Sequence, residues 1–467
     1  MKKFILLFAI TLLFTGCKAS QKTNIDEDQA KNKQQIDTHD SSSNAPNNET
    51  SDTSFIDGPE EEIATKLLNF FIAKDYKSIS NYKFTAQVKP YMKEDALKSS
   101  HDKVTSFAGE FKEILSTDVT EQDGNKIVTI ICSYTNSSLK CIISFNESKE
   151  IQGFNFLPHN NDGTTPSNIE EINIEFGDNE YKLPGVLTIP KDTDNYPIVI
   201  LVHGSGPCDK DETIYNNKPF RDIAHGLASN GIGVLRYDKR TFVYGKKMSI
   251  EDLTVYDETI DDVVYAYNYL LNNETINPKG IYILGHSLGG YLMPRIAEKL
   301  SDANGYIVLA GSARPIEDLL VYQTSYFANL DKKVTDQEQK QIDYIKNLSD
   351  KIKSLNALSN LTAKNLGGVG KNYYLDLKDY NPASLATKIT KPILFLQGKR
   401  DYQVTLEDFN IWKSSLEEKD NTTFKLYEGL NHIFMKGEGT PSPKEYSIPS
   451  KVDDNVINDI SNWILEK

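Results

Sequence analysis

The sequence predicts an α/β fold, a doubly wound and mostly parallel sheet with a helical insertion, preceded by a small α+β domain. Continuous apolar runs such as residues 196–204 are typical of strands that are buried on both faces of a parallel sheet. Helical stretches alternate with these runs from about residue 169 onward, which is the pattern of a doubly wound sheet. Residues 56–160 show a different order, helices first and then strands of period two, and this predicts a separate domain.

The elements of the larger domain, predicted to span residues 165–467, follow in chain order. We expect a starting hairpin at residues 172–176 and 181–189, and then strands at 196–204, 233–238, 280–285, 305–311, 392–398 and 423–427. Helices are expected at 220–230, 257–271, after Gly289, and at 406–416 and 456–465.

The small domain should begin with a helix, because Ile63, Leu67, Phe70 and Phe71 recur at helical spacing. A second helical stretch is expected at residues 88–100, and strands at 107–115, 126–135, 139–145 and 151–156. This order resembles NTF2-like modules, and the resemblance implies an accessory or binding role.

Two cysteines lie on consecutive strands of this small domain. If residues 136–137 form a two-residue hairpin turn, Cys132 lies opposite Cys141 in a non-hydrogen-bonded pair, where a disulfide is feasible. The pattern then places both cysteines on one wholly apolar face. The sequence does not decide between a disulfide bond and two free thiols at these positions.

The first residues have the pattern of an export signal. Lys2 and Lys3 precede an apolar run at residues 4–14, which is too short to span a membrane. Small residues then precede Cys17, and this resembles a bacterial lipobox, with Phe14 where leucine is usual. The resemblance implies that residues 1–16 are removed and that a lipid on Cys17 anchors the protein to the extracytoplasmic face of the cell membrane. An ordinary cleaved signal with an accidental cysteine is the alternative.

Residues 17–55 are polar and contain almost no aliphatic side chains, so we expect a disordered tether. The net charge of −14 comes without a basic cluster and argues against a nucleic-acid partner. Only four cysteines occur, with no Cys-x-x-Cys pair, so neither a zinc site nor a disulfide scaffold is indicated. We expect no metal and no cofactor.

The strongest chemical motif is Gly285-His286-Ser287-Leu288-Gly289. It lies between a predicted strand and a predicted helix, which is the context of a nucleophile turn. The glycines are expected because larger Cβ atoms would collide with the neighbouring strand and helix. Ser287 is therefore the candidate nucleophile, and an ordinary turn with an inert serine is the alternative.

Two backbone N–H groups should stabilise an oxyanion beside this serine. One is that of Leu288, which follows the nucleophile. The other is that of Ser205 in the glycine-rich segment 203–207, which follows a predicted strand. We expect His203 to form a structural hydrogen bond that holds this loop.

The general base is found by elimination among seven histidines. His432 is the one that lies on a loop after the last predicted strand, at the carboxyl edge of the sheet. Asp401 follows the preceding strand, so the chain order Ser287, Asp401, His432 is that of sheets with this kind of nucleophile turn. Asp401 would orient the imidazole, or it would simply cap a helix.

These motifs, with "HGSGPCDKDE", "GHSLGG" and "GKRDYQV", resemble a bacterial branch of the α/β-hydrolases described as carboxylesterases or serine aminopeptidase-like hydrolases. The resemblance implies hydrolysis of small-molecule esters without metal or cofactor. Thr241 departs from it, since many members have glycine there. A peptidase or amidase of the same fold and a non-catalytic surface-binding lipoprotein are the alternatives.

Residues 312–383 form an insertion of helical character, which we expect to cap the serine, with surface decoration as the alternative. The candidate lining residues are aromatic: Tyr322, Tyr326, Phe327, Tyr373 and Tyr374.

Overall fold

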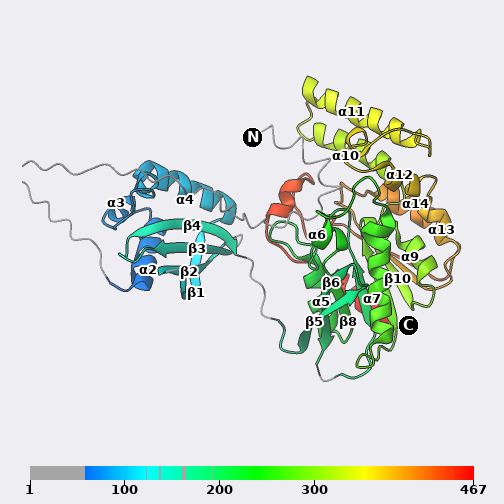
Figure 1. The fold of residues 1–467 in the computed structure, drawn as a ribbon, viewed down its shortest axis with the longest axis horizontal. Coiled ribbons are helices and arrows are strands. Elements are labelled where there is room, and N and C mark those ends of the chain that lie inside the picture. Colours follow the sequence, from blue (N-terminus) through cyan, green and yellow to red (C-terminus); the bar gives the residue numbers. More distant parts are fainter. Residues whose placement is uncertain (1–57, 123, 136–137, 160–164, 192, 467) are drawn as a thin grey trace, which may run out of the picture. The chain divides into compact units, whose positions relative to one another are not determined.

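The computed structural model describes residues 58–122, 124–135, 138–159, 165–191 and 193–466. The described residues up to 159 form one compact unit and those from 165 form another (Figure 1). The predicted signal segment, Cys17 and the tether lie outside the described residues. No helix among the described residues is long and apolar enough to cross a membrane.

The larger unit, which we call the hydrolase unit, is built on one sheet of eight strands in the order β12-β11-β10-β9-β7-β8-β6-β5. Strands β7 to β12 are parallel, and β5 and β6 are antiparallel at one end. The strands are β5 (Ile169–Gly177), β6 (Lys182–Pro190), β7 (Ile198–Val202), β8 (Gly233–Tyr237), β9 (Ile281–His286), β10 (Gly305–Leu309), β11 (Ile393–Gly398) and β12 (Thr422–Tyr427). The prediction of a mostly parallel sheet is confirmed.

Helices cover both faces of this sheet. On one face of the sheet, the core includes α7, α9 and α14 together with Ile198, Ile200 and Val202 of β7. On the other face, the core includes α5 and α15 together with Val199 and Leu201 of β7. The helices are α5 (Pro219–Ser229), α6 (Arg240–Tyr244), the π-helical turn η2 (Tyr256–Ile260), α7 (Asp261–Asn272), α8 (Leu288–Tyr291), α9 (Met293–Lys299), α14 (Leu406–Leu416), the 3₁₀ turn η4 (Pro443–Ser447) and α15 (Asp454–Leu465). A strand buried on both faces has a continuous apolar sequence for this reason.

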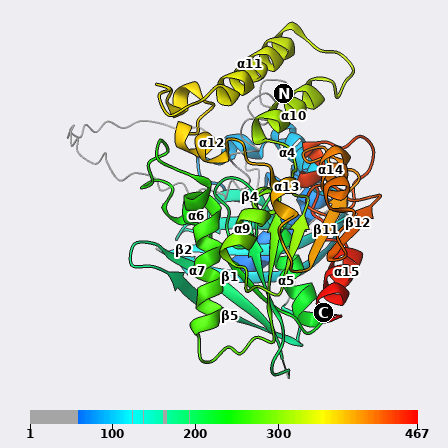
Figure 2. The same ribbon diagram turned by 90° about the vertical axis from the view of Figure 1, so that its right-hand side faces the viewer.

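The insertion after β10 is helical, as expected. It contains α10 (Ile316–Ala328), α11 (Asp336–Lys353), the 3₁₀ turn η3 (Ala363–Asn365), α12 (Lys371–Leu377) and α13 (Pro382–Ala386). Helices α10, α11 and α12 lie together at one end of the hydrolase unit in both views (Figures 1 and 2). The start of α11 is defined by a capping box between Thr335 and Glu338.

The N-terminal unit packs helices against a four-stranded antiparallel sheet in the order β1-β2-β3-β4. Its elements are α2 (Glu60–Ile72), α3 (Tyr76–Ile79), the 3₁₀ turn η1 (Lys89–Met92), α4 (Glu94–Ala108), β1 (Phe111–Gln122), β2 (Asn125–Tyr134), β3 (Ser138–Phe145) and β4 (Ile151–His159). An α+β unit of this kind was predicted.

Two boundaries of this unit differ from prediction. The second helix begins at Glu94 and not at residue 88, because Pro90 lies in the separate turn η1. It continues to Ala108, so the segment expected to start a strand at residue 107 is helical. The helix ends where Gly109 adopts a φ of 80°, and β1 begins at Phe111.

The predicted pairing of Cys132 with Cys141 is wrong. Cys132 lies opposite Leu139, and Cys141 lies opposite Ile130, so the register is shifted by two residues. Both thiols are free and buried. A shift of two keeps every side chain on its face, so the shared apolar face is as predicted although the pairing is not. The turn on which the prediction depended, residues 136–137, lies outside the described residues.

Candidate active site

The predicted site residues follow neighbouring parallel strands. Ser287 comes directly after β9, Asp401 follows β11, and His432 follows β12. Ser205 follows β7, which pairs with β9. The carboxyl ends of parallel strands meet at one edge of the sheet, so the topology brings all four residues to the same edge.

The turn at Ser287 is sharp and strained. Ser287 has a φ of 52° and a ψ of −110°, which non-glycine residues rarely adopt. A Cβ at Gly285 would lie 2.3 Å from the carbonyl oxygen of Gly289, and a Cβ at Gly289 would lie 2.5 Å from that of Val202. The expected reason for both glycines is therefore confirmed, and the strain fits a turn that exposes a nucleophile.

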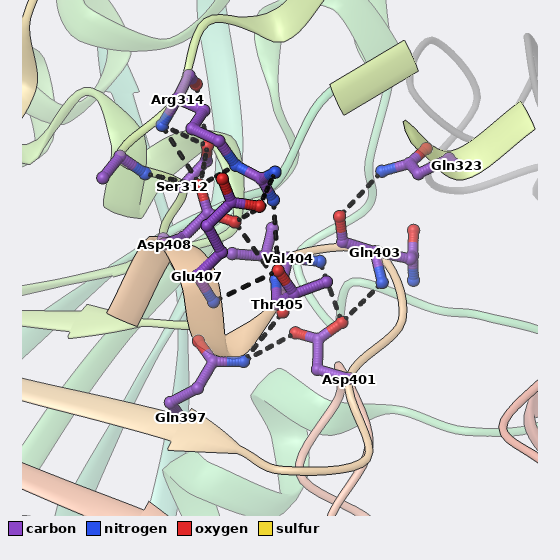
Figure 3. Close-up of polar contacts among 12 residues, drawn as sticks. Ser312, Arg314, Gln323, Gln397, Asp401, Gln403, Val404, Thr405, Glu407 and Asp408 are labelled. Carbon is purple, nitrogen blue, oxygen red and sulfur yellow. Dashed lines mark hydrogen bonds and ion pairs between the residues drawn. The ribbon is translucent and has the colours of Figure 1, made fainter. Parts of the chain in front are cut away.

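His432 and Asp401 form a buried hydrogen-bonded pair. The His432 Nδ1 lies 2.7 Å from the Asp401 Oδ2, and the two residues are 4% and 5% exposed. The other carboxylate oxygen accepts the N–H groups of Gln403 at 2.8 Å and Val404 at 3.0 Å. Gln397 donates to the Asp401 Oδ2 at 3.1 Å (Figure 3). These bonds hold the carboxylate in one orientation toward the imidazole.

The helix-cap alternative for Asp401 is excluded. The N-cap of α14 is Thr405, whose side chain accepts the N–H of Glu407. The Asp401 carboxylate instead binds the imidazole of His432 and the backbone N–H groups of its own loop.

No hydrogen bond joins Ser287 to His432 in the described part of the chain. The imidazole ring of His432 lies 4.8 Å, between centroids, from that of His286, the residue before Ser287. Catalytic hydrogen bonds are often long in unliganded enzymes and tighten when substrate binds.

The two candidate oxyanion donors lie beside the nucleophile. A Cβ built on Gly204 would lie 3.3 Å from the Cβ of Ser287, so the loop after β7 approaches the serine closely. In the part of the chain that the structure describes, no acceptor binds the N–H of Ser205 or of Leu288. Both residues line the same cavity as Ser287, and their N–H groups are available to a ligand.

This cavity has a volume of about 40 Å³. It is lined by Ser205, Ser287, Leu288, Tyr291, Ser312, Ile316, Leu319, Gln323, Tyr373, Gln403 and Val404. Of the five aromatic candidates from the insertion, Tyr373 is the one that lines it. Tyr326 instead stacks on Tyr402 and donates to the carbonyl oxygen of Pro441.

The lining residues that the sequence analysis missed are mainly on α10 and on the loop after Asp401. Ile316, Leu319 and Gln323 recur at helical spacing on α10. The helical spacing of these residues could have predicted that they share a buried face of the helix. It does not predict which part of the protein that face contacts. Gln323 donates to the carbonyl oxygen of Gln403 at 3.0 Å, which ties the insertion to the Asp401 loop (Figure 3).

A buried acid behind the site was also missed. The Glu212 Oε1 accepts the N–H of Gly204 at 2.6 Å, and its Oε2 lies 2.8 Å from the His286 Nδ1. The His286 Nε2 lies 2.9 Å from the carbonyl oxygen of His432. Burial works against both charges, but their mutual attraction lowers the pKa of Glu212 and raises the pKa of His286.

Three other described histidines have structural partners. The His203 Nε2 lies 3.1 Å from the carbonyl oxygen of Asp209, as predicted, and burial lowers the pKa of His203 to about 3. His225 pairs with Glu171, and His101 packs against Phe71 in the N-terminal unit. Within the described residues, no three His, Cys, Asp or Glu side chains gather as potential metal ligands.

Comparison with known proteins gives a family match in each unit. The family model "serine aminopeptidase, S33" matches residues 197–438, and a family described as a protein of unknown function matches residues 64–154. The esterase EstD of Thermotoga maritima is 34% identical over 395 residues, which cover 81% of this chain and 89% of that protein.

Solved structures similar to this chain include Est1E from Butyrivibrio proteoclasticus. Its TM-score is 0.40 at 17% identity, over 63% of this chain and 98% of that one. An esterase from Pyrococcus furiosus has a TM-score of 0.38 at 18% identity, over 57% of this chain and 83% of that one. The family match covers more than half of the chain, including Ser205, Ser287, Asp401 and His432. The chain therefore belongs to the serine aminopeptidase S33 family and is a hydrolase of the α/β-hydrolase fold.

Proposed function

We propose that this hydrolase cleaves carboxylic esters through an acyl-enzyme intermediate on Ser287, with His432 as general base and Asp401 as its partner. The observation that carries the proposal is the buried Asp401–His432 pair at the sheet edge where the strained Ser287 lies. The 34% identity to a protein described as an esterase supports the choice of ester.

The proposed reaction uses these groups in turn. The His432 Nε2 removes the proton of the Ser287 hydroxyl as its oxygen attacks the ester carbonyl carbon. The carbonyl oxygen becomes an oxyanion and accepts the N–H groups of Ser205 and Leu288. The tetrahedral intermediate then expels the alcohol, which takes the proton from His432. Water, deprotonated by His432, attacks the acyl-enzyme carbonyl carbon. The second tetrahedral intermediate expels the Ser287 oxygen, which takes the proton back from His432, and the acid is released.

The cavity favours esters over N-terminal amino acids. An aminopeptidase of this fold needs a carboxylate to hold the ammonium group of its substrate. None of the residues that line the cavity is acidic. At the start of α10, Asp318 pairs with Lys353, and Glu317 does not line the cavity. The amidase remains the second candidate, because the same groups can cleave an amide.

The location of the protein is a separate proposal. We infer from the segment before Cys17 that a lipid on this cysteine anchors the enzyme to the extracytoplasmic face of the cell membrane. Mass spectrometry of the N-terminal peptide tests this, together with the release of a Cys17→Ala variant from the membrane. An unmodified cysteine in membrane-associated protein would contradict the inference.

The test of the proposed function is the Ser287→Ala variant. We expect it to lose ester turnover and labelling by a fluorophosphonate, while its thermal unfolding is nearly unchanged. Replacement of the exposed Ser301 by alanine is the matched control and should retain both. Labelling of Ser287→Ala at the level of the unsubstituted protein would overturn the assignment.

A further inference from the structure

We propose that the buried ion pair of Lys239 and Glu258 positions the oxyanion loop, defined here as Gly204–Gly206, and thereby sets the direction of the Ser205 N–H. The inference rests on the proposed function. It gives two residues outside the catalytic groups a role in stabilising the transition state.

The ion pair binds the loop on both sides of Ser205. The Lys239 Nζ lies 2.7 Å from the carbonyl oxygen of Gly204 and 3.1 Å from that of Gly206. It also lies 2.9 Å from the Glu258 Oε1, which accepts the N–H of Gly206 at 2.7 Å. An ammonium group has three N–H donors, and these three acceptors use all of them.

Both charges are fully enclosed. Lys239 is 1% exposed and Glu258 is 4% exposed. Burial disfavours the charge of Lys239, but Glu258, together with Cys208 and Asp262, outweighs this and raises the pKa of Lys239, so the lysine is a cation at neutral pH. A buried ion pair is often no more stabilising than apolar side chains of the same size, so burial alone is weak evidence that this pair serves stability.

The geometry of a peptide unit explains why the pair matters to catalysis. The carbonyl of Gly204 and the N–H of Ser205 belong to one planar, trans peptide, so they point in opposite directions. By binding that carbonyl, Lys239 fixes the direction of the Ser205 N–H. A cation at the carbonyl oxygen also polarises the peptide and makes its N–H a stronger donor.

Glu258 fixes the next peptide in the same way, because it accepts the N–H of Gly206. The Gly204 N–H is held by Glu212. Every backbone N–H and C=O group of Gly204 and Gly206 is therefore bound, while the Ser205 N–H has no acceptor in the described part of the chain. This is the arrangement of a donor that is oriented in advance for an oxyanion.

Lys239 and Glu258 both lie outside regular α-helices and strands. Lys239 follows β8 and is the N-cap residue of α6. Glu258 lies in the π-helical turn η2, a rare conformation that is frequent at functional sites.

The neighbouring ion pair of Arg240 and Asp262 provides a matched control. Arg240 is the next residue after Lys239, and Asp262 lies one turn after Glu258. The Arg240 Nε lies 2.9 Å from the Asp262 Oδ1, and the two residues are 4% and 0% exposed. This pair joins α6 to α7 and is about as deeply buried, but its bonds do not include the oxyanion loop.

The experiment compares Glu258→Gln, the double variant Lys239→Met/Glu258→Gln, and Asp262→Asn. The endpoint of fluorophosphonate labelling gives the concentration of active sites, so that kcat is measured per folded enzyme with a p-nitrophenyl ester. The inhibition constant of a trifluoromethyl ketone, whose adduct with the serine carries the oxyanion, is measured in parallel. The double variant leaves no unpaired buried charge, so it remains informative if Glu258→Gln does not fold.

We expect both substitutions at the Lys239–Glu258 pair to lower kcat by at least about tenfold, with KM changed less than about threefold, because loss of one oxyanion donor costs roughly 10²- to 10³-fold. The trifluoromethyl ketone should bind more weakly by about the same factor as kcat/KM falls. Asp262→Asn should change thermal stability while its kcat per site stays within about twofold. A double variant whose kcat per site equals that of Asp262→Asn would overturn the inference. An unsubstituted enzyme that cleaves no ester would instead refute the proposed function.

Discussion

Arg314 and Asp408 form an ion pair in which the Arg314 Nη2 lies 2.7 Å from the Asp408 Oδ2, and Asp408 is fully buried (Figure 3). The other carboxylate oxygen accepts the N–H groups of Ala313 and Arg314, both at 3.1 Å. The pair therefore joins the first residues of the insertion to the start of α14, which follows the Asp401 loop.

We expect Asp408→Ala to lower the free energy of unfolding of the hydrolase unit by about 3–5 kcal/mol, because it removes the buried carboxylate that pairs with Arg314 and leaves the N–H groups of Ala313 and Thr405 without an acceptor. Both tryptophans, Trp412 and Trp463, lie in this unit, so fluorescence in urea reports its unfolding alone. Glu407 also pairs with Arg314, but its side chain is 61% exposed. Glu407→Ala should cost less than about 1 kcal/mol. Equal losses in the two variants would contradict the structural account.

The Asp401→Asn variant should lose about 10³- to 10⁴-fold in kcat with KM little changed. An amide can still accept the N–H groups of Gln403 and Val404 at the Oδ1 position. Its NH₂ group would meet the Nδ1–H of His432, however, and favour the wrong imidazole tautomer. Steady-state kinetics checks this, with the exposed Asp420→Asn as the control. A loss below about tenfold would mean that Asp401 is not the partner of the general base.

Esters should be cleaved faster than aminoacyl anilides. We expect kcat/KM on a short-chain p-nitrophenyl ester to exceed that on any aminoacyl anilide by at least about a hundredfold, or about 2.7 kcal/mol of transition-state energy. The reasons are the better leaving group of the ester and the lack of an acidic residue among those that line the cavity. An anilide cleaved as fast as the ester would support the aminopeptidase instead.

The thiols of Cys132 and Cys141 should remain unreactive in the native protein. Burial raises the pKa of Cys132 to about 12 and that of Cys141 well above its usual value. A thiol reagent should therefore modify neither before unfolding, and both after unfolding without reductant. Peptide mapping by mass spectrometry distinguishes them from the other cysteines. A disulfide-linked peptide containing the two residues would show that the register differs from the one described.

The sequence by itself determined the sheet and the order of its strands along the chain. Strands such as β7 and β9 are buried on both faces, and a continuous apolar run follows from that burial. The glycines at 285 and 289 marked the turn at Ser287, because no larger side chain fits there. Asp401 and His432 could be located from their places after consecutive strands, and their catalytic roles remain predictions.

Only the tertiary structure decided which side chains meet across the fold. The period of a strand determines the face of each residue but not its register, so Cys132 and Cys141 were placed on the correct face and paired wrongly. In the sequence, Lys239 and Glu258 look like ordinary charged residues. Their sequence neighbours do not predict that both are buried against the loop after β7. Burial and hydrogen-bond partners depend on chain segments distant in sequence, and for this reason the residues that position the oxyanion loop became visible only in the folded protein.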